Sequence, residues 1–208
     1  MYESACVQPF VACNSVFACD SKSSMKMIVF LNLLFSFSFS FANATPSLTS
    51  MEGMNVLSGE TVKLDLTGKK GSVVVFLSAK CPCSGSHEVV LNDLAKEYPD
   101  FIFVGVHSNA DEDKTITKNH FAEAKLSFPV LQDSRSAWAN QLGALKTPHA
   151  FVFNPKGELL YQGGVTDSHV GPAAKKTFLK DVLSDIQSGK APRMKEGRAL
   201  GCFIQREG

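Results

Sequence analysis

The stretch of sequence that decides the fold is Val73-Val74-Val75-Phe76-Leu77-Ser78-Ala79-Lys80-Cys81-Pro82-Cys83-Ser84. Its first five residues are apolar and mostly β-branched, which is typical of a strand buried on both faces of a parallel or mixed sheet. The strand delivers two cysteines to its carboxyl end and to the start of a helix, where α/β folds place reactive groups. Free backbone N–H groups and the helix dipole favour a thiolate there, and thiolate is the nucleophile. Two cysteines one residue apart do not easily form a relaxed disulfide, so the pattern favours a reactive Cys81 over an inert one.

Helix and strand patterns alternate along the rest of the chain. The expected elements are a helix ending at Pro99, a strand at 101–106, a helix around 116–124, a shorter helix at 134–142, strands at 150–153 and 158–161, and a last helix from Pro172 to Gly189. The order βαβα followed by ββα predicts an α/β sandwich with one parallel and one antiparallel edge. Ahead of this core, Val56–Leu66 predicts a short β-hairpin.

The amino-terminal region has the features of a signal peptide. Ile28–Phe41 is an apolar core too short to span a bilayer, Lys26 precedes it, and Ala42-Asn43-Ala44 supplies small residues for cleavage after Ala44. These features are complete if translation starts at Met25. The alternatives are a long leader from residue 1 and, more weakly, lipoprotein processing at Cys19.

The resulting division is a leader at 1–44 (signal peptide 25–44), a linker at 45–55, a domain at 56–188 and a tail at 189–208. The 208 residues leave room for one sizeable core, and 21 basic against 20 acidic residues give no field suited to nucleic acid. No apolar run is long enough for a stable membrane span after leader cleavage. Cleavage leaves three cysteines, Cys81, Cys83 and Cys202, in oxidising surroundings, and an odd number excludes a purely structural disulfide framework.

Three segments together resemble the thioredoxin-like redoxins over about residues 56–188. They are Lys80-Cys81-Pro82-Cys83-Ser84, Thr147-Pro148 and Asn154-Pro155-Lys156-Gly157. The resemblance is greatest to exported TlpA-type redoxins, which commonly carry a short hairpin ahead of the core. It implies a thioredoxin-like sandwich with a mixed sheet, helices on both faces and an N-terminal hairpin extension. It also implies a cis Pro148 beside Cys81, with the Thr147 backbone available to an extended thiol substrate.

This resemblance implies an exported thiol–disulfide oxidoreductase without an organic cofactor. Its partners would be protein thiols and disulfides or an upstream electron donor. The sequence departs from the family because Ser84 occupies the second cysteine position and Cys83 lies inside the motif. Cys81 is the expected nucleophile and Cys83 the first candidate to resolve it, through a Cys81–Cys83 disulfide that would be strained and oxidising. Alternatively Cys202 resolves Cys81, carried there by a flexible segment at 190–198.

A peroxiredoxin is the competing enzyme. Its motif has a proline seven residues and a Thr or Ser three residues before the cysteine, so Ser78 fits and Val74 does not. Its peroxide-polarising arginine would fall near Pro148. A hydroxyl alone cannot orient peroxide and stabilise the developing charge.

A Sco-like copper chaperone is the competing binding protein, with Cys81, Cys83 and His149 as the weak candidate ligands. Its cysteines are three residues apart, unlike these, and the favoured prediction has no metal ligands. His87, in the first turn of the cysteine-bearing helix, is an alternative residue to tune the thiolate. The acidic run Asp111-Glu112-Asp113 is typical of a solvated helix start.

Overall fold

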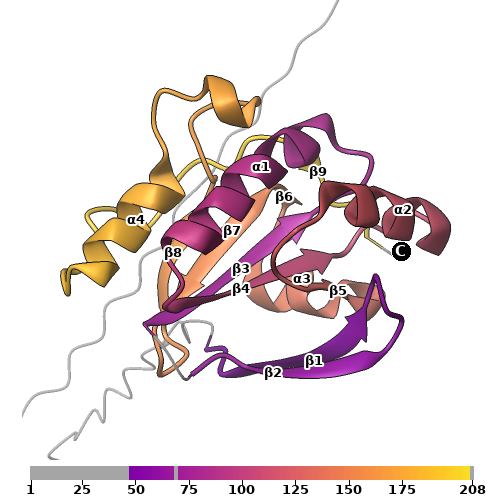
Figure 1. Ribbon diagram of the computed structural model, residues 1–208, viewed down its shortest axis with the longest axis horizontal. Coiled ribbons are helices and arrows are strands. Elements are labelled where there is room, and N and C mark those ends of the chain that lie inside the picture. Colours follow the sequence, from indigo (N-terminus) through magenta and orange to yellow (C-terminus); the bar gives the residue numbers. More distant parts are fainter. Residues whose placement is uncertain (1–46, 68–69, 207–208) are drawn as a thin grey trace, which may run out of the picture. The chain divides into compact units, whose positions relative to one another are not determined.

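A seven-stranded mixed sheet is built around β3, formed by Gly71–Leu77 (Figure 1). The computed structural model describes residues 47–67 and 70–206, so the predicted leader at 1–44 lies outside the described residues. The strand order is β2-β1-β5-β4-β3-β7-β8, with β3, β4 and β5 parallel and the other pairs antiparallel. The elements are β1 Ser50–Asn55, β2 Thr61–Asp65, β3 Gly71–Leu77, α1 Pro82–Glu97, β4 Phe101–His107, α2 Lys114–Ala124, β5 Val130–Gln132, η1 Ser134–Ser136, α3 Ala137–Leu142, β6 Lys146–Thr147, β7 His149–Phe153, β8 Leu159–Gly163, η2 Gly171–Ala173, α4 Phe178–Gln187 and β9 Cys202–Phe203.

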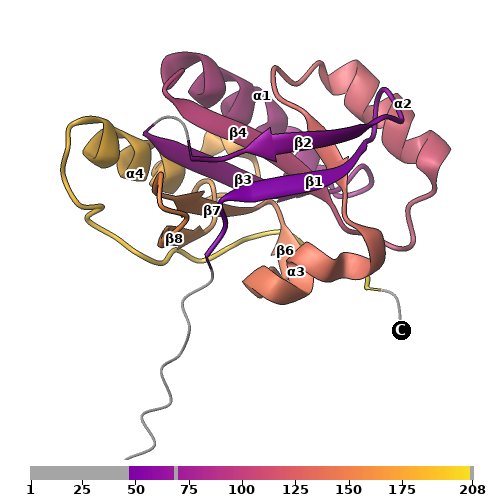
Figure 2. The same cartoon turned by 90° about the horizontal axis from the view of Figure 1, so that it is seen from below.

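The alternation of side chains along β3 divides the interior into two cores. Val73, Val75 and Leu77 point into a core that also receives side chains from α1, α2 and α4. Val74 and Phe76 point into the opposite core, which α3 covers (Figure 2). All seven residues of β3 are buried, as expected for a strand covered on both faces. The predicted α/β sandwich with helices on both faces is therefore confirmed.

The amino-terminal hairpin is present but begins earlier than predicted. Ser50–Asn55, which the sequence placed in a linker, forms β1 and pairs with β2. Met51 is only 1% exposed, so β1 contributes a core residue and belongs to the domain. Strand β1 also pairs with β5, a three-residue strand that the sequence did not reveal. In this pairing Met54 of β1 lies opposite Gln132 of β5.

The last helix begins later than predicted. Pro172 lies in the short η2, and α4 starts at Phe178. The intervening loop is held by the Asp167 carboxylate, which accepts hydrogen bonds of 2.9 Å from the backbone N–H groups of Lys175 and Lys176. Those bonds fix the loop in a non-helical conformation, which explains the late start.

The segment at 190–198, expected to be a flexible tether, instead makes defined contacts. Arg193 donates two hydrogen bonds to the Asp185 carboxylate, at 2.7 and 2.9 Å, and the ion pair lowers the pKa of Asp185 to about 2. Farther along, Gln162 on β8 donates its backbone N–H to Lys195 and accepts one from Gly197. The tail thus runs along the outer edge of β8 toward β9, which pairs with β6.

Candidate active site

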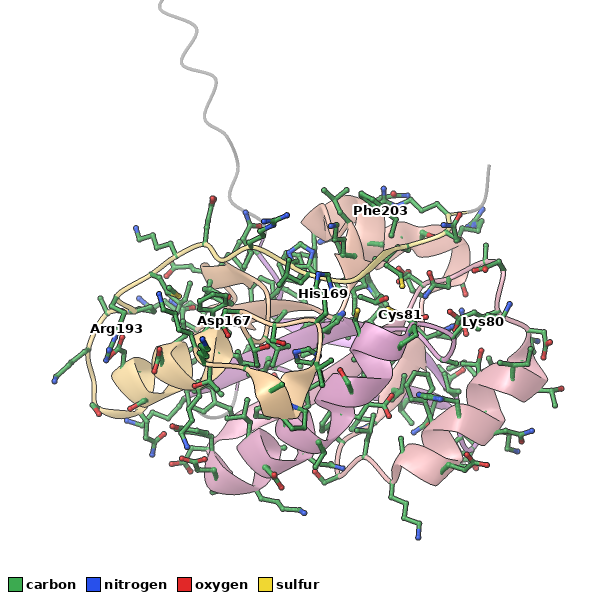
Figure 3. The ribbon with its side chains drawn as sticks, turned by 90° about the horizontal axis from the view of Figure 1, so that it is seen from above. Lys80, Cys81, Asp167, His169, Arg193 and Phe203 are labelled. Carbon is green, nitrogen blue, oxygen red and sulfur yellow. The ribbon has the colours of Figure 1, made fainter. Side chains whose placement is uncertain are left out.

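Cys81 lies directly before the first residue of α1, where the chain leaves β3 (Figure 3). Pro82 opens the helix, and the first helical bond runs from the Gly85 N–H to the Cys81 carbonyl at 3.0 Å. The Cys81 N–H donates to the Ser78 hydroxyl at 2.9 Å, which fixes the turn between strand and helix. The sulfur is therefore held at the positive end of a helix of 16 residues.

The tail strand β9 lies against this sulfur. Cys202 pairs with Thr147 across the antiparallel β6–β9 ladder, and its N–H donates to the Cys81 Sγ at 3.4 Å. The Cys81 Sγ is also 3.2 Å from the Thr147 carbonyl oxygen. The Thr147–Pro148 peptide bond is cis, as the resemblance implied. The structure thus brings four of the predicted site residues, Cys81, Thr147, Pro148 and Cys202, to one place.

Hydrogen bonds distinguish the protonation behaviour of the two adjacent thiols. Burial alone would raise the Cys81 pKa, but hydrogen bonds from the Cys202 thiol and the Ser84 backbone N–H outweigh burial and lower this pKa. The same bond to Cys81, together with burial, raises the pKa of Cys202 to about 11. Of the two thiols, Cys81 therefore ionises more readily than Cys202.

Cys83 is the second residue of α1, and its Sγ is 3.4 Å from Nδ1 of His169. Burial and the charge of Cys81 raise the Cys83 pKa, so this thiol ionises less readily than Cys81. His87 contacts the Cys83 carbonyl oxygen and the Thr166 hydroxyl, at 2.7 and 2.8 Å. The histidine that approaches a cysteine sulfur is thus His169, which the sequence did not single out.

His149, proposed as a copper ligand, makes different contacts. Its Nδ1 accepts the Leu145 N–H at 3.3 Å, and its ring packs against Phe151 with centroids 4.5 Å apart. Burial lowers its pKa to about 4. In the part of the chain that the structure describes, histidine, cysteine and acidic side chains form no group of three suited to a metal ion. The set Cys81, Cys83 and His149 is therefore not assembled as a ligand cluster.

A buried acid network supports the turn that carries Cys81. The Ser78 hydroxyl and the Ala79 N–H donate to the two oxygens of Glu112, at 2.5 and 2.7 Å. His107 Nε2 lies 2.9 Å from the same carboxylate, and its Nδ1 lies 3.0 Å from the Gln132 side-chain oxygen. Burial opposes ionisation, but these hydrogen bonds dominate and lower the Glu112 pKa. The expectation of a solvated acidic run was wrong for Glu112, which is 8% exposed.

We expect Glu112→Gln to lower the free energy of unfolding by about 2 kcal/mol at neutral pH, because an amide N–H₂ replaces one acceptor of a buried network. A carboxyl whose pKa is lowered by folding stabilises the protein above its ordinary pKa, and this stabilisation is lost as pH falls through the folded value. The difference between the variant and the wild type should therefore shrink in acid. Urea unfolding at two pH values measures it, with Glu123→Gln on the exposed side of α2 as the control. Equal losses at both pH values would contradict the assignment of the stabilisation to the ionised carboxylate.

A cavity of about 190 Å³ opens beside the two sulfurs. It is lined by Ser78, Lys80, Cys81, Asn109, Asp111, Glu112, Cys202, Phe203 and Gln205. Lys80 flanks Cys81 on the side opposite His169 in Figure 3 and donates a hydrogen bond to the Asp111 carbonyl oxygen. The lining is mostly polar and contains no arginine.

The sequence matches the redoxin family over residues 43–177, which include Cys81 and the cis Thr147–Pro148 bond. The chain belongs to the redoxin family. Redoxins are oxidoreductases that act as disulfide oxidoreductases or as peroxidases. Three segments of the site, the Cys81 turn, the Glu112 loop and Thr147-Pro148, lie inside the matched region, whereas Cys202 lies beyond it.

Solved structures share the thioredoxin-like fold of this redoxin. An uncharacterised conserved protein from Geobacillus kaustophilus is 23% identical with a TM-score of 0.70, over 78% of this chain and 92% of its own. A putative thiol:disulfide interchange protein DsbE from Chlorobium tepidum is 20% identical, with a TM-score of 0.50 over 57% and 82%. The peroxidoxin BcpB from Mycobacterium tuberculosis is 16% identical, with a TM-score of 0.52 over 69% and 96%. At these identities the likeness shows the fold alone.

A search among curated proteins finds no match for this chain. Within residues 47–67 and 70–206, no helix combines the length and the apolar character needed to cross a bilayer.

Proposed function

We propose that this redoxin is an exported thiol–disulfide oxidoreductase, with Cys81 as the nucleophile and Cys202 as the thiol that resolves it. The observation that carries the proposal is the contact of Cys202 with the Cys81 sulfur, through both its N–H and its thiol. Its partners are protein thiols and disulfides or an upstream electron donor. Export, of the TlpA type, rests on the leader pattern at 25–44.

The hydrogen bond between the Cys202 thiol and the Cys81 sulfur bears on both chemical steps of the exchange. The Cys81 thiolate attacks one sulfur of a substrate disulfide; a Cys81–substrate bond forms, the substrate S–S bond breaks, and the second substrate sulfur leaves as a thiolate. Cys81 then carries no charge, so the interaction that raises the Cys202 pKa is removed. The Cys202 proton passes to solvent or to the departing thiolate. The Cys202 thiolate then attacks Cys81, which forms Cys81–Cys202 and releases the second substrate thiol.

Cys83 is the less favourable resolving thiol. A Cys81–Cys83 bond would close a strained ring, because only Pro82 separates the two residues. Its sulfur contacts His169, and its pKa is raised chiefly by burial. The direction of exchange depends on the redox potential of the Cys81–Cys202 pair against those of its partners.

Two observations favour disulfide exchange over peroxide reduction. The Ser78 hydroxyl, which a peroxiredoxin would use toward peroxide, donates to Glu112 and accepts the Cys81 N–H. The cavity at Cys81 is lined by a lysine and two acids but no arginine. A peroxidase needs donors aimed at the developing charge, and Ser78 is committed elsewhere.

Equilibration of the full chain in thiol–disulfide buffers, followed by acid quenching and peptide mapping without reduction, tests the proposal. We expect a single two-electron transition that yields a Cys81–Cys202 crosslink within one chain. A Cys81–Cys83 crosslink with Cys202 free, or a dimer joined through Cys202, would contradict Cys202 as the resolving thiol. The same map, applied to protein from the exported fraction of the cell, identifies the amino terminus, and we expect Thr45.

A further inference from the structure

The backbone edge expected to receive an extended thiol substrate is already filled by the protein itself. Cys202 lies opposite Thr147, and Phe203 lies opposite Lys146. One residue farther on, the Ile204 N–H donates to the Leu145 carbonyl at 3.0 Å. The tail therefore holds a β-strand position beside cis-Pro148 that a client peptide would otherwise take.

The tail fits this position because it has a glycine at the closest approach. Gly201 has a φ of +147°, a conformation that residues with a side chain rarely adopt. A Cβ at residue 201 would overlap the Thr147 carbonyl oxygen. Only glycine brings the next residue, Cys202, into register with Thr147 and next to the Cys81 sulfur.

Anchors after Cys202 keep the strand in place. Ile204 is buried in the same core as β3 residues Val74 and Phe76. The Gln205 carbonyl accepts the Ala110 N–H at 2.8 Å, and its N–H donates to the Asn109 side chain at 3.0 Å. Arg206 then donates to backbone carbonyls at the end of α3. None of these contacts involves the Cys202 thiol.

With the strand docked, the remaining access to Cys81 is limited. The cavity beside the two sulfurs measures about 190 Å³. Pockets for drug-sized ligands are typically about 300–1,000 Å³, so this one admits a smaller group. A small disulfide can present its sulfur there, whereas an extended peptide needs the edge that β9 covers.

Building on the proposed function, we infer that the strand at 201–206 selects the substrates of Cys81: the resting protein reacts with small disulfides through the cavity and with extended peptide disulfides only after the tail has left Thr147. Attack by the Cys81 thiolate has the same electron balance for both substrates. One S–S bond breaks, one forms at Cys81, and a thiolate leaves. The tail affects how close the substrate sulfur comes, and it competes at the high effective concentration of a tethered segment.

Two probes with the same leaving group test the inference on the full chain. The small probe is the mixed disulfide of methanethiol with thionitrobenzoate; the extended probe is a peptide whose central cysteine carries the same thionitrobenzoate group. Loss of the free Cys81 thiol, whether to the probe adduct or to the Cys81–Cys202 disulfide, is followed by acid quenching and peptide mapping. The measured quantity is the ratio of the extended-probe rate to the small-probe rate, since any change in the Cys81 pKa cancels in it.

Gly201→Ala is expected to raise this ratio about tenfold or more, equivalent to about 1.4 kcal/mol. Removal of residues 201–208 should have the same effect and serves if Gly201→Ala folds poorly. Gly189→Ala is the matched control: Gly189 also has a positive φ, of +75°, but a Cβ there meets nothing within 4 Å. That control should leave the ratio unchanged.

Equal rates for the two probes in the wild type, or a ratio that neither tail variant raises, would overturn the inference. If Cys81 reacts with both probes at an unaltered ratio, the proposed function survives and only the tail's role is wrong. If Cys81 reacts with neither probe in any variant, the proposed function itself fails.

Discussion

Cys81→Ser should abolish thiol–disulfide exchange, with a loss of about 10³-fold or more in kcat/KM, as for removal of a covalent nucleophile. The reason is that a serine hydroxyl is not ionised at neutral pH, whereas the hydrogen bonds from Cys202 and from Ser84 lower the pKa of Cys81 and favour its thiolate. Reduction of a peptide disulfide with a dithiol as electron donor measures the loss. Cys83→Ser is the matched control, since it makes the same chemical change two residues away and should keep most of the activity.

The peroxidase alternative is tested in the same preparation. If the wild type turns over hydrogen peroxide rapidly and Ser78→Ala abolishes that turnover, the chain is a peroxidase and the proposal is wrong. We expect slow peroxide turnover. Because the Ser78 hydroxyl bonds to Glu112 and the Cys81 N–H, its removal should affect stability more than disulfide exchange.

Cys202→Ser has the second largest expected effect, the trapping of a mixed disulfide at Cys81. Without the resolving thiol the second step cannot occur, so the Cys81–substrate adduct should rise from a trace to nearly one per chain. Multiple-turnover activity should fall about 100-fold. Non-reducing mass spectrometry of the acid-quenched reaction measures the adduct.

The cysteine at position 83 again supplies the comparison. Cys83→Ser should resolve as fast as the wild type, because its thiol contacts His169 and is not part of the β6–β9 ladder. Accumulation of the adduct in Cys83→Ser but not in Cys202→Ser would reverse the assignment of the two thiols.

Local sequence patterns were enough to predict the central fold. The apolar runs that became β3, β4 and β7 are buried on both faces. Such a run can be recognised as a strand without knowing which strands pair with it. The position of Cys81 followed from the same signal, because the short turn Ser78-Ala79-Lys80 carries it from the end of β3 to the start of α1. Short elements were harder: β5 has three residues, and its strand identity depends on pairing with both β1 and β4.

The parts of the site that the sequence did not predict depend on long-range contacts. Glu112 stands in an acidic run that is typical of an exposed helix start, and only its distance to Ser78 and His107 distinguishes it from its neighbours. The sequence offered Cys202 as a resolving thiol carried to Cys81 by a flexible segment, but it did not predict the β6–β9 pairing that holds Cys202 there. A Gly-Cys pair after a polar segment predicts neither a register nor a strand.

The path of the tail along β8 has a consequence for the sheet as a whole. β8 is the last strand of the seven, and an uncovered last strand offers free N–H and C=O groups to other chains. Gln162 uses its backbone groups on Lys195 and Gly197, so the segment before β9 shields this edge from self-association. Release of this segment after a proteolytic cut near Lys190 would therefore remove the thiol partner of Cys81 and at the same time create a surface on which copies of the protein could add strand to strand.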